Sequence, residues 1–188
     1  MSKEKLYIFD TTLRDGAQTQ GVDFSIDDKV KITSALDNLG VDYIEGGWPG
    51  ANPTDTEFFQ KKLNLKNSKL TAFGMTKKTG RSADNDPGIS AILNSNTPSV
   101  CLVGKTWDFH VDIALGISNE ENLENISESA KHFIKKNKEF MFDAEHFFDG
   151  YKDNPEYALS CLKAAFNQGA RWVVLCDTNG GTLPHEVS

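Results

Sequence analysis

The residues best suited to chemistry lie in the stretch FDTTLRDGAQTQG, residues 9–21, where a short apolar run leads into Asp10, Arg14 and Asp15. A carboxylate is the oxygen ligand that a hard divalent cation takes. An arginine adds a permanent cation with a planar fork of donors, which can stabilise an oxyanion that develops during a reaction. Without its surroundings, however, an Arg–Asp pair is more often a plain surface ion pair.

The backbone sets a condition on this pair. Adjacent residues of a regular strand point to opposite faces, so Arg14 and Asp15 can serve one site only if the strand has already ended. Gly16 follows them directly and permits a turn. We therefore expect both side chains to lie on a loop after the first strand.

Polar groups also follow the other apolar runs. The expected strands end at their carboxyl sides in Asp10, Glu45, Lys105, Glu145 and Asp177. A single acidic residue in such a place is more often a turn former or a helix cap. The five polar strand ends are expected to converge at one face if the strands are parallel, because barrel enzymes build their active sites at that face.

The elements that position these groups are short, continuous apolar runs separated by amphipathic segments. Continuous runs are typical of parallel strands that are covered on both faces. The expected strands are residues 6–9, 43–46, 70–75, 99–103, 140–145 and 172–177. Helix starts are predicted at Ser25 with Asp28, Thr54 with Glu57, Ser118 with Glu121, and Asn154 with Pro155, and a further helix over residues 87–95.

Alternating strands and helices imply right-handed crossovers and parallel pairing, hence a doubly wound sheet or a (β/α)₈ TIM barrel. No GxGxxG follows the first strand, and the charged strand ends favour the α/β barrel. About six of the eight strand-helix units are visible, whereas a typical barrel needs roughly 250 residues. We expect residues 1–188 to be the N-terminal part of a catalytic barrel whose C-terminal units are missing, with unpaired edges at its first and sixth strands.

Composition narrows the possible partners. The 188 residues include 27 acidic and 20 basic side chains, a net charge of −7, so no global positive field attracts nucleic acid or an anionic membrane surface. The three cysteines form no CxxC pair and are expected to be reduced, structural thiols. No signal peptide or apolar membrane span is evident, which favours a cytoplasmic location.

The motifs resemble one enzyme family. DTTLRDGAQTQG resembles the N-terminal signature of the pyruvate carboxyltransferase-like TIM barrels, which include the isopropylmalate, homocitrate and citramalate synthases and the hydroxymethylglutaryl-CoA lyases. FDAEHFFDGYKDNP and LCDTNGGTLPHEV fall where the fifth-strand and sixth-strand motifs of that family belong. YIEGGWPGANPTDTEFF is similar to the (R)-citramalate synthase branch.

The resemblance implies a chemistry. A divalent metal (Mg, Mn or Zn) holds a 2-keto acid, and the methyl carbon of acetyl-CoA adds to its keto carbon. With pyruvate the product is (R)-citramalate, on the route to isoleucine and the other branched-chain amino acids. The full-length protein is expected to be a homodimer. Isopropylmalate or homocitrate synthesis, carbon-carbon cleavage by a lyase, and an inactive barrel fragment remain alternatives, and the 188-residue chain alone is expected to be inactive.

The resemblance also implies roles for residues. Asp15 would be a metal ligand, and Arg14 a catalytic and substrate-binding cation. Glu145 would either manage a proton or orient the substrate and a metal-bound water. Proton transfer requires a carboxylate whose pKa is raised by burial, and the apolar strand before it could provide that burial. Gln18 and Thr178 would contact substrate. From the residues alone, Glu145 is as well explained as a helix cap and Thr178 better explained as a turn residue.

Four histidines are available as metal ligands, but none matches the His-x-His pair that the family places on its seventh strand. His110, His132, His146 and His185 are therefore interpreted as structural or solvated, with His146 the least secure because it follows Glu145. The glycine pairs at 46–47 and 180–181 are expected to allow close backbone approach or positive φ.

Overall fold

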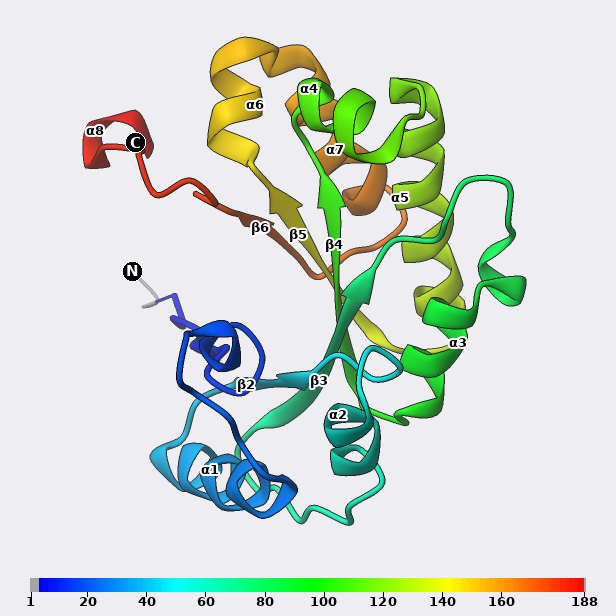
Figure 1. Ribbon diagram of the computed structural model, residues 1–188. Helices are drawn as coiled ribbons and strands as arrows, with labels where there is room; N and C mark the ends of the chain where they lie inside the picture. The colour runs from blue at the N-terminus through cyan, green and yellow to red at the C-terminus, as the bar shows by residue number, and fades with distance from the viewer. Residues whose placement is uncertain (1–3, 188) are drawn as a thin grey trace. The chain divides into compact units, whose positions relative to one another are not determined.

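The computed structural model describes residues 4–187 (Figure 1). The strands are β1 (Phe9–Asp10), β2 (Tyr43–Gly47), β3 (Lys69–Met75), β4 (Ser99–Lys105), β5 (Glu139–Glu145) and β6 (Trp172–Leu175). The main helices are α1 (Ile26–Leu39), α2 (Pro53–Phe58), α3 (Pro87–Asn94), α4 (Asp108–His110), α5 (Asn119–Lys135), α6 (Phe147–Asp153), α7 (Pro155–Phe166) and α8 (Pro184–Val187).

The six strands follow one another in the sheet in the order of the chain, and the pairs β1–β2, β2–β3 and β5–β6 run parallel. This order, with helices in the connections, is that of a partial (β/α)₈ barrel, as the sequence predicts. The chain divides into two compact units, residues 4–74 with 91–100 and residues 75–90 with 101–187.

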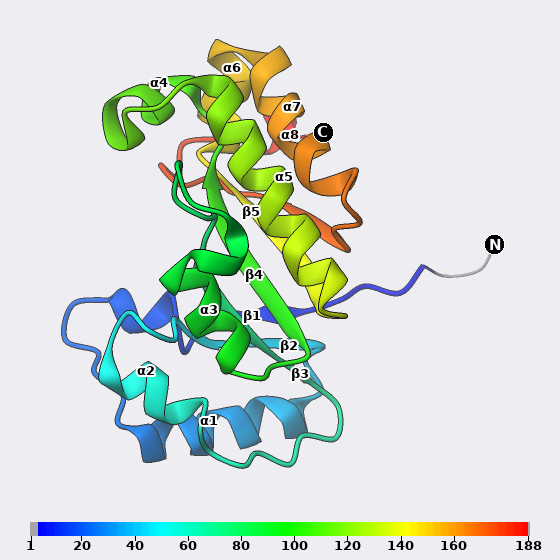
Figure 2. The same cartoon turned by 90° about the vertical axis from the view of Figure 1, so that its right-hand side faces the viewer.

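In the first unit, α1 contacts both β2 and α2 (Figure 2). The predicted capping box at the start of α1 is confirmed, because the Ser25 hydroxyl accepts from the Asp28 N–H and the Asp28 carboxylate accepts from the Ser25 N–H. Gly40 ends the helix in the left-handed region, at φ 89°. The boundaries of this helix were therefore predictable from its caps.

The buried face of α1 differs from the one that its apolar residues predict. Leu39 is 76% exposed, whereas Lys29, Thr33 and Asp37 are buried at i, i+4 and i+8. Each of these polar side chains is satisfied: the Thr33 hydroxyl donates to the Lys29 carbonyl, and Asp37 accepts from the backbone N–H groups of residues 66–68. Burial of a polar stripe is tolerated only because all its members are hydrogen-bonded.

Two further predictions need correction in this unit. The first strand is Phe9–Asp10, which is shorter than the predicted residues 6–9 and lies in register with Tyr43 and Ile44 of β2. The cap of α2 is Asn52 and not Thr54, since the Asn52 side chain accepts from the Asp55 N–H and Pro53 takes the first helical position.

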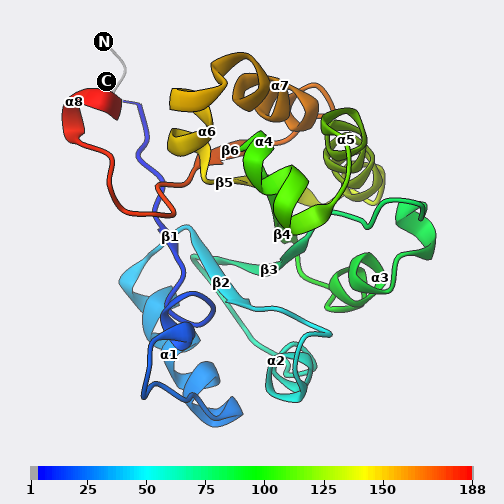
Figure 3. The same ribbon diagram turned by 45° about the horizontal axis from the view of Figure 1, so that its top comes forward.

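In the second unit, α5 and α7 pack against each other and against β5 (Figure 3). Both helix starts are as predicted, with a capping box at Ser118 and Asn154 capping the α7 N-terminus. Ile126, Ala130 and Phe133 of α5 are fully buried. The short helices α4 and α6, and a π-helical turn over Val111–Leu115, are not predicted by periodicity.

None of the cysteines Cys101, Cys161 and Cys176 forms a disulfide bond within the described residues, and Cys101 and Cys161 are buried. Among the described residues, no helix is both long enough and apolar enough to cross a membrane.

Candidate active site

Arg14 lies on the loop after β1, held by the Arg14 N–H and the Gly16 N–H, which both donate to the Thr11 carbonyl. Its Nη1 donates to Asp15 Oδ1 at 3.0 Å, and its Nε donates to Glu45 Oε2 at 2.6 Å. The guanidinium carbon lies 4.0 Å from the centre of the Phe73 ring. The loop therefore turns Arg14 and Asp15 together, as the sequence requires for a shared site, and a carboxylate and an aromatic face fix the guanidinium.

Glu45, the partner of Arg14, was expected at the end of its strand, and this prediction is wrong. It is the third of the five residues of β2, not its end, and its side chain is fully buried. A buried carboxylate is strongly destabilising unless it is paired. The charge-assisted bond from Arg14 satisfies that requirement and, in return, holds the arginine in one orientation.

Asp15 presents its carboxylate outward, with a side chain that is 62% exposed. Its Oδ1 accepts from Arg14, and its Oδ2 makes no hydrogen bond or ion pair with the described residues. An accessible carboxylate oxygen is a ligand that a divalent cation accepts, so Asp15 fits the role of one metal ligand.

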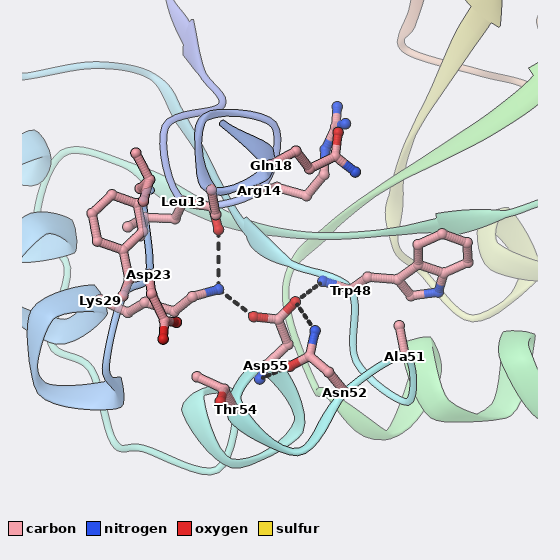
Figure 4. A pocket seen from close by; sticks show the side chains of 13 residues that line it. Leu13, Arg14, Gln18, Asp23, Lys29, Trp48, Ala51, Asn52, Thr54 and Asp55 are labelled. Atoms are coloured by element: carbon pink, nitrogen blue, oxygen red, sulfur yellow. Dashed lines mark hydrogen bonds and ion pairs between the residues drawn. The ribbon is translucent and has the colours of Figure 1, made fainter. Parts of the chain in front are cut away.

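A cavity of about 460 Å³ opens beside this loop, within the first unit (Figure 4). Its lining includes Arg14 and Gln18 from the loop, and Trp48, Asn52 and Thr54 from the segment after β2. Gln18 itself is exposed. The predicted residues Arg14 and Gln18 thus contribute to one cavity wall.

The floor of the cavity holds a buried ion pair that the sequence reading missed (Figure 4). Lys29 Nζ contacts Asp55 Oδ1 and donates to the carbonyls of Leu13 and Gly46 at 3.0 and 2.9 Å. The other oxygen of Asp55 accepts from the Trp48 N–H and the Asn52 side chain. A signal was present, because Lys29 lies one and two turns before Thr33 and Asp37 on a single polar stripe of α1.

Gly47 confirms the expected close approach at the end of β2. Its φ is 140°, and a Cβ at this position would lie 2.5 to 2.7 Å from the Asp55 carboxylate. A side chain at residue 47 would therefore displace the partner of Lys29.

In the second unit, Glu145 ends β5 as predicted. Its environment is polar, since Oε2 lies 2.5 Å from Lys105 Nζ and the side chain is 25% exposed. The expectation of a carboxyl group buried among apolar residues is therefore wrong. Glu145 is instead held by an ion pair with Lys105 and remains partly open to solvent.

Thr178 follows β6, and its hydroxyl accepts from the His146 N–H at 2.9 Å. His146 stands in the left-handed region, at φ 56°, and its Nδ1 lies 3.2 Å from Asp149. Asn179 also donates to Asp149. These bonds tie the loop after β5 to the loop after β6, so Glu145 and Thr178 are held within one connected hydrogen-bonded segment.

The other three histidines differ in burial: His132 is buried, His110 is partly buried and His185 is exposed. The His110 ring packs on the His146 ring with centres 4.3 Å apart, and burial is the main cause of a lowered pKa at His110. His132 is buried on α5 near Asp84, and burial lowers its pKa as well. His185 is exposed at the start of α8.

Known proteins resemble the chain over almost its whole length. The (R)-citramalate synthase of Aquifex aeolicus is 56% identical over 186 residues, which are 98% of this chain and 35% of that protein. That of Geobacter sulfurreducens is 50% identical, over 100% of this chain and 35% of the relative. The 2-isopropylmalate synthase of Lactococcus lactis subsp. cremoris is 32% identical, over 97% of this chain and 34% of the relative. The chain thus spans about a third of the length of these relatives.

Among solved structures, the HMG-CoA lyase of Bacillus subtilis superposes with a TM-score of 0.79, covering 97% of this chain and 61% of the lyase, at 19% identity. That likeness shows the barrel fold alone. The profile of the HMGL-like family matches residues 5–188. With this match and the identity to the synthases, the chain belongs to the HMGL-like family, the pyruvate carboxyltransferase-type barrels.

Proposed function

We propose that the full-length protein condenses acetyl-CoA with pyruvate to give (R)-citramalate, in a reaction that depends on a divalent metal. The observation that carries this proposal is the order of the relatives: the chain is much more similar to (R)-citramalate synthases than to 2-isopropylmalate synthases. The proposal includes a cytoplasmic location, a homodimer and a role in branched-chain amino acid synthesis. Residues 1–188 form the N-terminal part of its catalytic barrel.

In the proposed reaction the methyl carbon of acetyl-CoA forms a bond to the keto carbon of pyruvate. The methyl group loses a proton, the keto oxygen becomes a hydroxyl, and water then cleaves the thioester to release CoA. When bound, the divalent cation supplies positive charge that polarises the keto group. Asp15 would be one of its ligands.

The protein side chains would act as follows. Arg14, fixed by Glu45, holds its cation beside the keto oxygen as negative charge develops there. Glu145, oriented by its ion pair with Lys105, accepts the methyl proton. Thr178 donates a hydrogen bond to the carboxylate of the keto acid, and Gln18 contacts the substrate close to the metal site. Arg14 and Glu145 thus have separate tasks, charge stabilisation and proton transfer.

A panel of 2-keto acids tests the proposal. Purified full-length protein is incubated with acetyl-CoA, a divalent metal and pyruvate, 2-ketoisovalerate, 2-ketoglutarate or 2-ketobutyrate, and free CoA thiol is measured. We expect the highest kcat/KM with pyruvate and (R)-citramalate as the product. A preference for 2-ketoisovalerate would instead identify an isopropylmalate synthase, and cleavage of a hydroxyacyl-CoA without condensation would identify a lyase.

A further inference from the structure

Lys29 is the least expected feature of the first unit. It is 3% exposed, and its ammonium group has three acceptors: the Leu13 carbonyl, the Gly46 carbonyl and the Asp55 carboxylate. An ammonium group has three protons, so its capacity is fully used inside the protein. It does not act on solvent or on a ligand.

The position of two of these acceptors is informative. Leu13 directly precedes Arg14, and Gly46 directly follows Glu45. The Lys29 ammonium group therefore binds a backbone carbonyl next to Arg14 and another next to Glu45. Arg14 Nε and Glu45 Oε2 are 2.6 Å apart. A displacement of either carbonyl would move the guanidinium relative to its carboxylate.

The ion pair itself is a poor explanation for stability. A buried ion pair often contributes no more than a well-packed apolar pair of the same volume, because desolvation offsets the attraction. The surrounding backbone is nevertheless shaped around it: Gly47 leaves room for the Asp55 carboxylate, which also accepts from the Trp48 N–H. The arrangement therefore fixes the positions of the backbone around Lys29 more than it adds to the free energy of unfolding.

We propose that Lys29 is a positioning residue for Arg14: its ammonium group sets the distance between the loop after β1 and strand β2, and thereby the orientation of the guanidinium in the active site. The inference rests on the proposed function for its kinetic consequence, but its geometric content does not depend on the substrate. Asp55 serves as the anchor that holds the ammonium group in place.

The test uses the full-length protein with the double variant Lys29→Met/Asp55→Asn, which removes both charges and leaves no buried ion alone. Asn at residue 55 still accepts from the Trp48 N–H. A misplacement of about 1 Å can cost about 100-fold in rate, so we expect kcat to fall about 100-fold with a smaller change in KM for pyruvate. In an Arg14→Lys background the same double change should lower kcat by less than about threefold, because residues that act as a unit are not additive.

Asp37→Asn is the matched control. Asp37 is a buried charge on the same helix, eight residues and about 12 Å farther along its axis, and its carboxylate accepts from the backbone N–H groups of residues 66–68. We expect it to lower the thermal midpoint without changing kcat. Two results would overturn the proposal and show that Lys29 only forms a structural ion pair. One is a double variant that keeps wild-type kcat. The other is a double variant that lowers kcat by the same factor in the Arg14→Lys background as in the wild-type background.

A crystal structure of the double variant provides a readout that needs no activity. We expect the distance between Arg14 Nε and Glu45 Oε2 to lengthen beyond about 3.2 Å, the upper limit for such a bond. An unchanged distance would overturn the proposal. If the wild-type protein releases no CoA with pyruvate, the proposed function fails while this distance still decides the role of Lys29.

Discussion

Replacing Arg14 by lysine keeps the charge and removes the fork, which makes it the sharpest perturbation of the candidate site. Arg14 contacts Glu45 through Nε at 2.6 Å and Asp15 through Nη1 at 3.0 Å, while its flat face lies 4.0 Å from the centre of the Phe73 ring. A lysine has one nitrogen and no flat face, so it cannot keep all three contacts.

The expected loss follows from these contacts. Removal of one preorganised charge-stabilising donor costs about 10²- to 10³-fold in kcat, or about 3 to 4 kcal/mol in the transition state. The ammonium group of the substituted lysine still neutralises the buried Glu45, so the free energy of unfolding should change little. In Arg14→Met, by contrast, Glu45 stays buried and loses its arginine partner, which costs about 3 to 5 kcal/mol of stability.

The assay combines CoA release at saturating pyruvate and acetyl-CoA with urea unfolding of the same preparations. We expect Arg14→Lys to have less than about one hundredth of the wild-type kcat and a nearly unchanged urea midpoint, and Arg14→Met to lose both activity and stability. An Arg14→Lys enzyme that retains more than about a tenth of wild-type kcat would refute the assigned role.

Three other predictions concern stability and reactivity. Hydrogen bonds from the backbone N–H of Lys66 and its neighbours lower the pKa of Asp37, so its charged form stabilises the fold above the unfolded pKa of about 3.9; Asp37→Asn should lower the urea midpoint at pH 7, and this difference should shrink as pH falls below about 4. Gly47→Ala should destabilise the protein by about 1 to 3 kcal/mol in urea titrations, because φ is 140° and the new Cβ would meet Asp55. Burial raises the pKa of the Cys161 thiol to about 12, so mass spectrometry should find Cys161 unmodified by iodoacetamide at pH 8 in the native protein and modified in urea.

Sequence reasoning succeeded where a local rule decides the structure. The caps at Ser25, Ser118 and Asn154 each place a helix start correctly, because a side chain that binds its own turn requires no distant partner. The loop that turns Arg14 and Asp15 together was predictable for the same reason, since alternation along a strand forbids their cooperation within one.

The failures at the candidate site involve partners that are distant in the chain. From the sequence, Lys29, Thr33 and Asp37 look like a solvent-exposed polar face of α1. They are buried because their partners lie far along the chain: Lys29 donates to the Gly46 carbonyl 17 residues away, and Asp37 accepts from the Ser68 N–H 31 residues away. Glu45 was placed at a strand end, although its pairing with Arg14 buries it in mid-strand. Likewise the apolar run before Glu145 suggested an apolar pocket, and Lys105 makes that environment polar.

The proposed task of Asp15 and Arg14 is to hold a metal ion together with the keto acid that it binds. Titration calorimetry of full-length protein with Mn²⁺, with and without pyruvate, tests it directly, using Asp15→Asn against the exposed Asp27→Asn as the matched control. We predict that Asp15→Asn weakens Mn²⁺ binding at least about tenfold, that is by about 1.4 kcal/mol or more. It should also abolish the change in Mn²⁺ affinity that pyruvate causes in the wild-type protein. Asp27→Asn should alter neither the Mn²⁺ affinity nor its dependence on pyruvate. Equal Mn²⁺ affinity in wild type and Asp15→Asn would contradict the account.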